Sequence, residues 1–181
     1  MYCRFWELDT DHDFLIDKED FSRYEGHALS RKAVDRIFDQ VPRKFKSDKK
    51  DKMNYEDFVW FMLSEEDKTT LRSIKYWFKV IDLDDNEIIT PHEMNYFYDE
   101  QIHRLEYLNH ESILFVDLLC QMNDLVKPSY EGHFYYEEIK AVRHSVGIFF
   151  NCLVNLNKFL AYETRDLFQL KNQLTEFPDY S

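Results

Sequence analysis

Two stretches of the sequence decide the fold. The first, Asp9-Thr-Asp-His-Asp-Phe-Leu-Ile-Asp-Lys-Glu-Asp20, places carboxylates at positions 1, 3, 5, 9 and 12 of a twelve-residue segment. The second, Asp82-Leu-Asp-Asp-Asn-Glu-Ile-Ile-Thr-Pro-His-Glu93, has oxygen-bearing side chains at the same five positions. A hard cation such as Ca²⁺ takes about six to eight oxygen ligands, so a tight loop must offer alternate side chains and a backbone carbonyl. Both stretches are therefore predicted to be cation-binding loops, each between two helices.

The order of these donors is the spacing of the EF-hand loop, in which position 7 contributes a carbonyl and position 12 a carboxylate from the following helix. The predicted metal ligands are Asp9, Asp11, Asp13, Leu15, Asp17 and Asp20 in one loop, and Asp82, Asp84, Asn86, Ile88, Thr90 and Glu93 in the other. Leu15 and Ile88 are expected to act through their carbonyls. Ile16 and Ile89, which follow them, are expected in the short strands that pair neighbouring loops. The predicted cofactor is Ca²⁺.

Both loops depart from the EF-hand pattern at position 6, where glycine usually adopts a positive φ. Phe14 and Glu87 occupy this position, and a left-handed residue other than glycine costs about 1–2 kcal/mol. The first loop also ends in Asp20, whose carboxylate is shorter than that of Glu93. Monodentate closure, a bridging water and some tolerance of Mg²⁺ are the alternatives at that end of the first loop.

The loops belong to a pattern that occurs four times along the chain. Each copy begins with an apolar residue, at Ile16, Met53, Ile89 and Phe134, and the spacings of 37, 36 and 45 residues suit helix-loop-helix units. Lysine stands at position 1 of the second and fourth loops, 46–57 and 127–138. Because a cationic side chain there excludes Ca²⁺, these two loops are predicted to be degenerate partners that complete each lobe.

The scarcity of glycine and proline, 3 and 4 residues of 181, favours an all-α fold. We expect two EF-hand-pair lobes, four helix-loop-helix units with very short loop-pairing strands, and a C-terminal helix. The N-terminal lobe is predicted at 1–66 and the C-terminal lobe at 67–166, followed by a tail at 167–181. A helix capped by Ser30 is predicted over 31–41, and an added apolar helix over 146–160.

Composition excludes several classes of function. The chain carries 35 acidic and 23 basic residues, a net charge of −12, which disfavours nucleic-acid binding. Three separated cysteines encode neither a disulfide framework nor a cysteine-rich zinc site. No apolar run is long enough for a membrane span, so an intracellular protein is expected. The absence of a glycine-rich phosphate loop or a nucleophile elbow argues against an enzyme.

Several blocks of sequence resemble the B-double-prime regulatory subunits of protein phosphatase 2A, an EF-hand family. They include Tyr2-Cys-Arg-Phe-Trp-Glu-Leu-Asp-Thr-Asp-His-Asp13, Tyr55-Glu-Asp-Phe-Val-Trp-Phe61 and Glu93-Met-Asn-Tyr-Phe-Tyr98. Two further blocks, Phe78-Lys-Val-Ile-Asp-Leu-Asp84 and Asn155-Leu-Asn-Lys-Phe159, are most similar to the plant-type branch. The resemblance covers residues 2–166.

This resemblance implies a calcium-binding regulatory subunit that is not itself catalytic. Its partners would be the phosphatase scaffold and catalytic subunits, and its holoenzyme would act on phosphoprotein substrates. Family members extend further at the N-terminus, so a C-terminal fragment is expected. The expected localisation is cytoplasmic, with cytoskeletal or centrosomal association and the nucleus as alternatives.

Two other functions are considered, a free-standing calmodulin-like sensor and an EF-hand interaction module. A free sensor exposes a methionine-rich groove when charged, whereas this chain has five scattered methionines.

Overall fold

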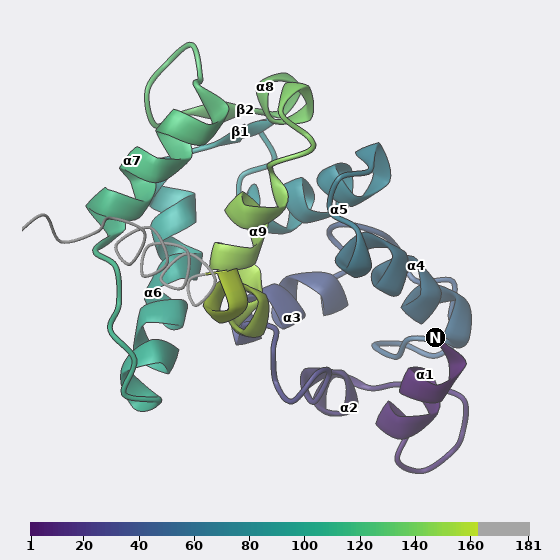
Figure 1. Ribbon diagram of the computed structural model, residues 1–181. Coiled ribbons are helices and arrows are strands. Elements are labelled where there is room, and N and C mark those ends of the chain that lie inside the picture. Colours follow the sequence, from purple (N-terminus) through teal and green to yellow (C-terminus); the bar gives the residue numbers. More distant parts are fainter. Residues whose placement is uncertain (163–181) are drawn as a thin grey trace, which may run out of the picture.

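The computed structural model describes residues 1–162, and these form an all-α fold with one very small sheet, as predicted (Figure 1). The helices are α1 (Tyr2–Leu8), α2 (Lys18–Ser22), α3 (Arg31–Phe38), α4 (Tyr55–Glu66), α5 (Leu71–Ile81), α6 (Pro91–Tyr107), α7 (Phe115–Val126), α8 (Tyr136–Ala141) and α9 (Gly147–Val154). The strands are β1 (Ile88–Ile89) and β2 (Phe134–Tyr135). The predicted tail, 167–181, lies outside the described residues.

Successive helices flank four loops, which are numbered here in chain order. Loop 1 (9–20) joins α1 to α2, loop 2 (46–57) lies between α3 and α4, loop 3 (82–93) joins α5 to α6, and loop 4 (127–138) lies between α7 and α8. Each pair of helices with its loop is one helix-loop-helix unit.

The loops pair through short backbone bridges. Ile16 and Met53 join loops 1 and 2, each donating its N–H to the carbonyl of the other at 2.8 Å. Loops 3 and 4 pair as an antiparallel ladder, with Ile89 opposite Phe134. Ile16 and Ile89 therefore occupy the loop-pairing positions predicted for them.

The helices that leave the loops begin at residues suited to helix N-termini. Asn54 and Thr90 form capping boxes with Asp57 and Glu93, three residues further on. In loop 1 the side chain of Asp17 accepts the N–H of Asp20 at 2.8 Å. Positions 9 and 12 of these three loops thus start the following helix, whether or not the loop has the acids needed to bind a cation.

Two predicted helices have different bounds in the structure. The helix expected over 31–41 ends at Phe38, because Gln40 adopts a positive φ of 60°. The helix expected over 146–160 is divided at Asn155, which forms an isolated bridge with Leu29. At this bridge the carbonyl of Val154 accepts the N–H of Ser30 at 2.9 Å. This carbonyl therefore bonds to a distant segment of the chain and not to a residue further along the helix. The chain is helical again over 156–162.

The core is one cluster of buried aromatic and aliphatic side chains that runs through both halves of the chain. Phe21 and Phe61, from the first two units, meet edge to face with ring centroids 4.7 Å apart. Phe61 also contacts Trp77 of α5, whose indole N–H donates to the Ser64 carbonyl at 2.8 Å. Phe149 of α9 is fully buried as well. Removal of this apolar surface from water holds the units together and fixes where the loops lie.

A buried polar network ties the end of α4 to the segment that follows α9. The Glu65 side chain, 1% exposed, accepts from Lys68 Nζ at 2.6 Å, Lys158 Nζ at 3.0 Å and Asn155 Nδ2 at 2.5 Å. Two cations and an amide therefore compensate one buried carboxylate. Among the described helices, none combines the length and the apolar character needed to cross a bilayer.

Candidate metal centres

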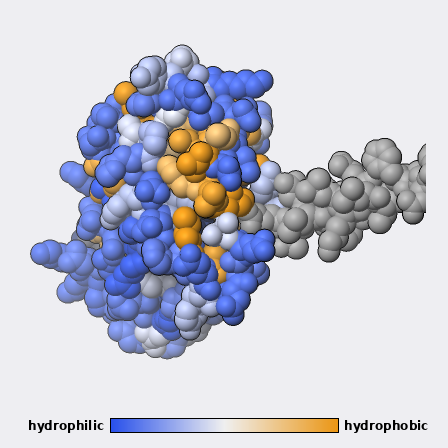
Figure 2. Space-filling model, turned by 90° about the vertical axis from the view of Figure 1, so that its left-hand side faces the viewer, coloured by the Kyte–Doolittle hydropathy of each residue, from blue (hydrophilic) through white to orange (hydrophobic). Residues whose placement is uncertain are grey.

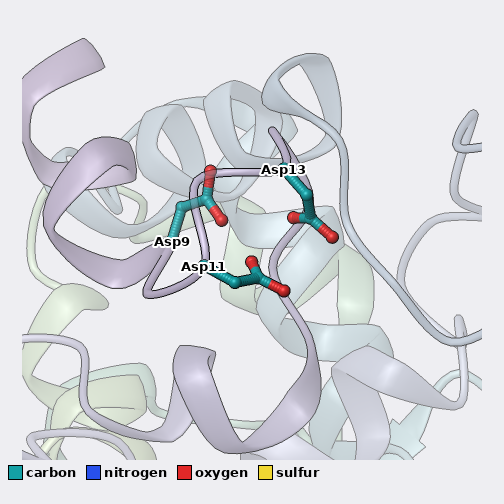
Figure 3. A group of neighbouring side chains, drawn as sticks. All are labelled: Asp9, Asp11 and Asp13. Atoms are coloured by element: carbon teal, nitrogen blue, oxygen red, sulfur yellow. The ribbon is translucent and has the colours of Figure 1, made fainter.

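Loop 1 gathers three of its predicted ligands into one group. The carboxylates of Asp9, Asp11 and Asp13 each offer an oxygen within 4.8 Å of the others (Figure 3). Asp9 is fully buried at the end of α1, and its Oδ2 accepts the N–H of Phe14 at 2.9 Å. Its Oδ1 is buried and has no hydrogen-bond partner among residues 1–162. A buried, unpartnered carboxylate oxygen beside two other acids is suited to binding a cation.

The closing residue of loop 1 lies apart from this group. Asp20 Oδ1 accepts the Thr10 hydroxyl at 2.9 Å and Arg23 Nη2 at 2.9 Å. Arg23 also donates to the Leu8 carbonyl at 3.1 Å. The Oδ1 atom of Asp20 is therefore already engaged by an arginine and a hydroxyl, with which an ion held by the first three acids must compete. The loop pattern does not reveal Arg23, because this residue lies beyond position 12.

Loop 3 includes its closing acid in the acidic group. Asp82, Asp84 and Glu93 offer oxygens within 4.8 Å of one another. Glu93 is 2% exposed, and it accepts the N–H groups of Leu83 and Thr90 at 2.5 and 3.1 Å. Loop 3 therefore already has the closing carboxylate in place, unlike loop 1.

The remaining predicted side-chain ligands serve the backbone. Asp17 and Thr90 cap α2 and α6, and the Asn86 carbonyl oxygen accepts the N–H of Ile88 at 3.1 Å. Leu15 donates its N–H to Asp13 at 3.0 Å. Leu15 and Ile88, the predicted carbonyl ligands, directly precede the loop-pairing residues Ile16 and Ile89.

The acids in both groups repel one another in part. Burial, together with repulsion from Glu93, raises the pKa of Asp82 from 3.8 to about 6. Burial and the neighbouring Asp11 and Asp13 likewise raise the pKa of Asp9. A bound divalent ion would favour the ionised forms of these groups and relieve the repulsion.

All four loops have a left-handed residue at position 6. Its φ is 64° at Phe14, 58° at Asp51, 63° at Glu87 and 79° at Gly132. The absence of glycine from loops 1 and 3 therefore does not prevent the EF-hand turn, although the turn is strained there.

An arginine outside loop 3 holds its first residue. Arg36 of α3 donates Nε to the Val80 carbonyl at 3.0 Å and Nη2 to the carbonyls of Lys79 and Asp82, both at 3.1 Å. A cation at the C-terminal end of α5 is favourable because the exposed carbonyls there carry partial negative charge. The first half of the chain thus helps to fix where loop 3 begins.

Four helix-loop-helix units, paired loops and two acidic groups define an EF-hand protein. Residues 1–63 match the model of an EF-hand domain pair.

The chain is 56% identical over 173 residues to a probable B''delta regulatory subunit of serine/threonine protein phosphatase 2A from Arabidopsis thaliana, and 47% identical over 171 residues to the B''beta regulatory subunit from Homo sapiens. These matches cover 96% and 94% of this chain but 32% and 30% of the relatives. A solved structure of a PP2A PR70 holoenzyme is similar as well, with a TM-score of 0.78 and 44% identity, covering 88% of this chain and 58% of that one.

These matches confirm the resemblance to B-double-prime regulatory subunits. The chain spans about a third of the length of the curated relatives it matches. The relatives are named as regulatory subunits, not as catalytic ones, in agreement with the predicted non-catalytic role.

Proposed function

We propose that this chain is the calcium-binding EF-hand region of a B-double-prime regulatory subunit of a protein phosphatase 2A holoenzyme. One combined observation carries the proposal. Two acidic groups lie at equivalent loop positions, in a chain that is similar to a B'' subunit over 96% of its length. By contacting the scaffold and the phosphoprotein substrates, the region would direct and tune the catalytic subunit. Its place of action would be the cytoplasm.

Calcium would bind at loops 1 and 3. In loop 1 the acids at positions 1, 3 and 5 would supply the first ligands, with Asp9 contributing its unpartnered oxygen. In loop 3 Asp82, Asp84 and Glu93 would hold the ion from both ends of the loop. The ion would supply positive charge that neutralises these acids, and the helices on either side would then be held at fixed positions.

A pull-down with the purified phosphatase scaffold subunit tests the proposal. The chain is expected to be retained, and retention is expected to fall when a chelator replaces calcium. The Asp11→Asn, Asp84→Asn double variant weakens calcium binding but keeps the first acid of each loop, and it serves as the control in the same buffer. No retention of the wild-type chain under either condition would contradict assignment to the holoenzyme.

A free-standing sensor is the second candidate, and the exposed surface is the relevant observation. Figure 2 shows an apolar area on the face that carries α6 and α7. The most exposed large apolar residues of this region are Tyr107, Leu114 and Val116, and none is a methionine. A flexible methionine-rich surface, which suits promiscuous sensors, is not formed there.

A further inference from the structure

We propose that Arg43 is a built-in cation of loop 2, and that it positions loop 1 for calcium. In this view the guanidinium takes the place that a metal ion has in an active loop, although it enters from just before the loop. The second half of this inference rests on the proposed binding of calcium at loop 1.

The closing acid of loop 2, Asp57, is the residue that Arg43 neutralises. The Asp57 side chain is fully buried and lies 2.7 Å from Arg43 Nη1. It also accepts the N–H groups of Lys46 at 2.8 Å, Ser47 at 3.2 Å and Asn54 at 3.2 Å. One carboxylate therefore joins the two ends of the loop. A buried charge needs such compensation, and here Arg43 supplies the opposite charge.

Arg43 is itself held in place. Its side chain is 19% exposed, and its Cζ lies 4.9 Å from the centroid of the Trp60 ring, one turn along α4 from Asp57. The ring face and the carboxylate together fix the planar guanidinium, an arrangement that suits arginine better than lysine. Glu56, the other acid near Arg43, is 3.9 Å away and half exposed.

The backbone of loop 2 shares the position-6 turn and the pairing bridge with loop 1. Asp51, at position 6, has a φ of 58°, close to the 64° of Phe14 in loop 1. Met53, at position 8, makes both bridge hydrogen bonds to Ile16. Loop 2 therefore forms the same turn and bridge as loop 1, and Arg43 supplies the positive charge that neutralises its closing acid.

This shape is transmitted to loop 1 through the bridge. Ile16 lies between Leu15 and Asp17, which are the predicted ligands at positions 7 and 9. If Arg43 orders loop 2, it also orders the partner that holds Ile16. Arg43 is thus a positioning residue for calcium and does not touch the ion.

Two features could keep calcium out of loop 2, and they can be separated by mutation. The first is the pair of lysines, Lys46 and Lys50, at positions 1 and 5. The second is the ion pair between Arg43 and the closing acid, Asp57. The Lys46→Asp, Lys50→Asp variant supplies the missing acids while Arg43 stays in place. Adding Arg43→Gln to this variant also frees Asp57.

Counting calcium ions per chain by native mass spectrometry and calorimetry tests the built-in cation. The double variant is expected to bind as many ions as the wild type, and the triple variant one more. The matched control adds Arg31→Gln to the double variant, because Arg31 is an exposed arginine paired with Glu19, and no additional ion is expected. An additional ion while Arg43 is present, or none in the triple variant, would overturn the proposal.

The positioning role is tested by Arg43→Gln alone. Its calcium affinity at loop 1 is expected to fall about fivefold, the lower end of typical coupling between sites, while loop 3 is unchanged. Arg43→Lys, which keeps the charge, is expected to recover part of the loss. Trp6, whose ring stacks on His12 of loop 1 at 3.8 Å, reports the titration by fluorescence.

Unchanged loop 1 affinity in Arg43→Gln would overturn the positioning role. A wild-type chain that binds no calcium at loop 1 would contradict the proposed function and this role together. The ion count in the triple variant would still decide whether Arg43 is the built-in cation of loop 2.

Discussion

The closing carboxylates of loops 1 and 3 are expected to differ in how much calcium binding depends on them. Glu93→Gln and Asp20→Asn each remove one negative charge and keep a side-chain oxygen. Glu93 belongs to the acidic group of its loop, whereas Asp20 is bound by Thr10 and Arg23. We therefore expect the glutamate substitution to weaken binding far more than the aspartate substitution.

The magnitude for Glu93 follows from its burial. Two unit charges about 4 Å apart interact by about 4 kcal/mol at an effective dielectric constant of about 20, and the double charge of the ion makes this about 8 kcal/mol. Roughly half of this attraction is offset by the oxygen that glutamine retains, by the relief of repulsion with Asp82 and by relaxation of the loop. The remaining loss of about 4 kcal/mol corresponds to a roughly thousandfold weaker affinity at loop 3.

The magnitude for Asp20 is smaller because an ion must first displace Arg23. The Asp20 side chain is 15% exposed, so an effective dielectric constant of about 40, between those of a buried site and of water, makes its attraction to a divalent ion about 4 kcal/mol at the same separation. The oxygen that asparagine retains and relaxation of the loop offset roughly half of this, as for Glu93, which leaves about 2 kcal/mol. Losing the Asp20–Arg23 pair, which is only partly exposed to water, offsets roughly 0.2–1 kcal/mol of this gain. About 1.4 kcal/mol then remains, a roughly tenfold effect at loop 1.

Calorimetric titration of both variants beside the wild type measures this ordering. Trp6 fluorescence assigns the loop 1 component, since the ring stacks on His12 of that loop. Circular dichroism in chelator serves as the folding control. If Asp20→Asn loses the larger share of binding free energy, total loop charge controls affinity and the reasoning from closing geometry is refuted.

Three further outcomes are expected. Calcium at a hundredfold excess over Kd should add about 2.7 kcal/mol of stability per independent site, so equal melting temperatures in calcium and in chelator would contradict binding to the folded state. Because the pKa of Asp82 is raised to about 6, the ion-free chain should lose stability as the pH rises from about 4 to 6. Calcium binding should release protons, and it should weaken below pH 6. Denaturation curves of Asp82→Asn should lack this pH dependence. Arg23→Gln should tighten calcium at loop 1 about threefold by freeing Asp20, and a titration showing weaker binding would refute competition by Arg23.

The sequence was sufficient to predict the parts of the fold that follow from local spacing. The loops and the loop-pairing positions of Ile16 and Ile89 repeat a regular pattern of donors and apolar residues. The division of the last apolar helix at Asn155 could not be predicted in this way, because it depends on a bridge to Leu29, far away in the chain.

The arginines that contact the closing acids were also missed. Arg23 and Arg43 lie outside the twelve positions of their loops, and an isolated arginine carries no signal of the carboxylate it contacts. Their effect on Asp20 and Asp57 appears only when the helices are assembled. The sequence therefore indicates which oxygens are available, while the packing determines which of them are already engaged.

The left-handed turn at position 6 shows that loop shape and cation binding are separable. Phe14 and Glu87 each donate their N–H to the first acid of their loop, Asp9 and Asp82, at 2.9 Å. This bond to a charged acceptor offsets about 1.5–3 kcal/mol, comparable to the strain of a left-handed residue. Loop 2 has lysine at position 1 and ties its ends through Asp57 instead. Position 1 thus shapes the active loops as well as supplying a ligand, so neutralising it should disturb the turn even in the absence of calcium.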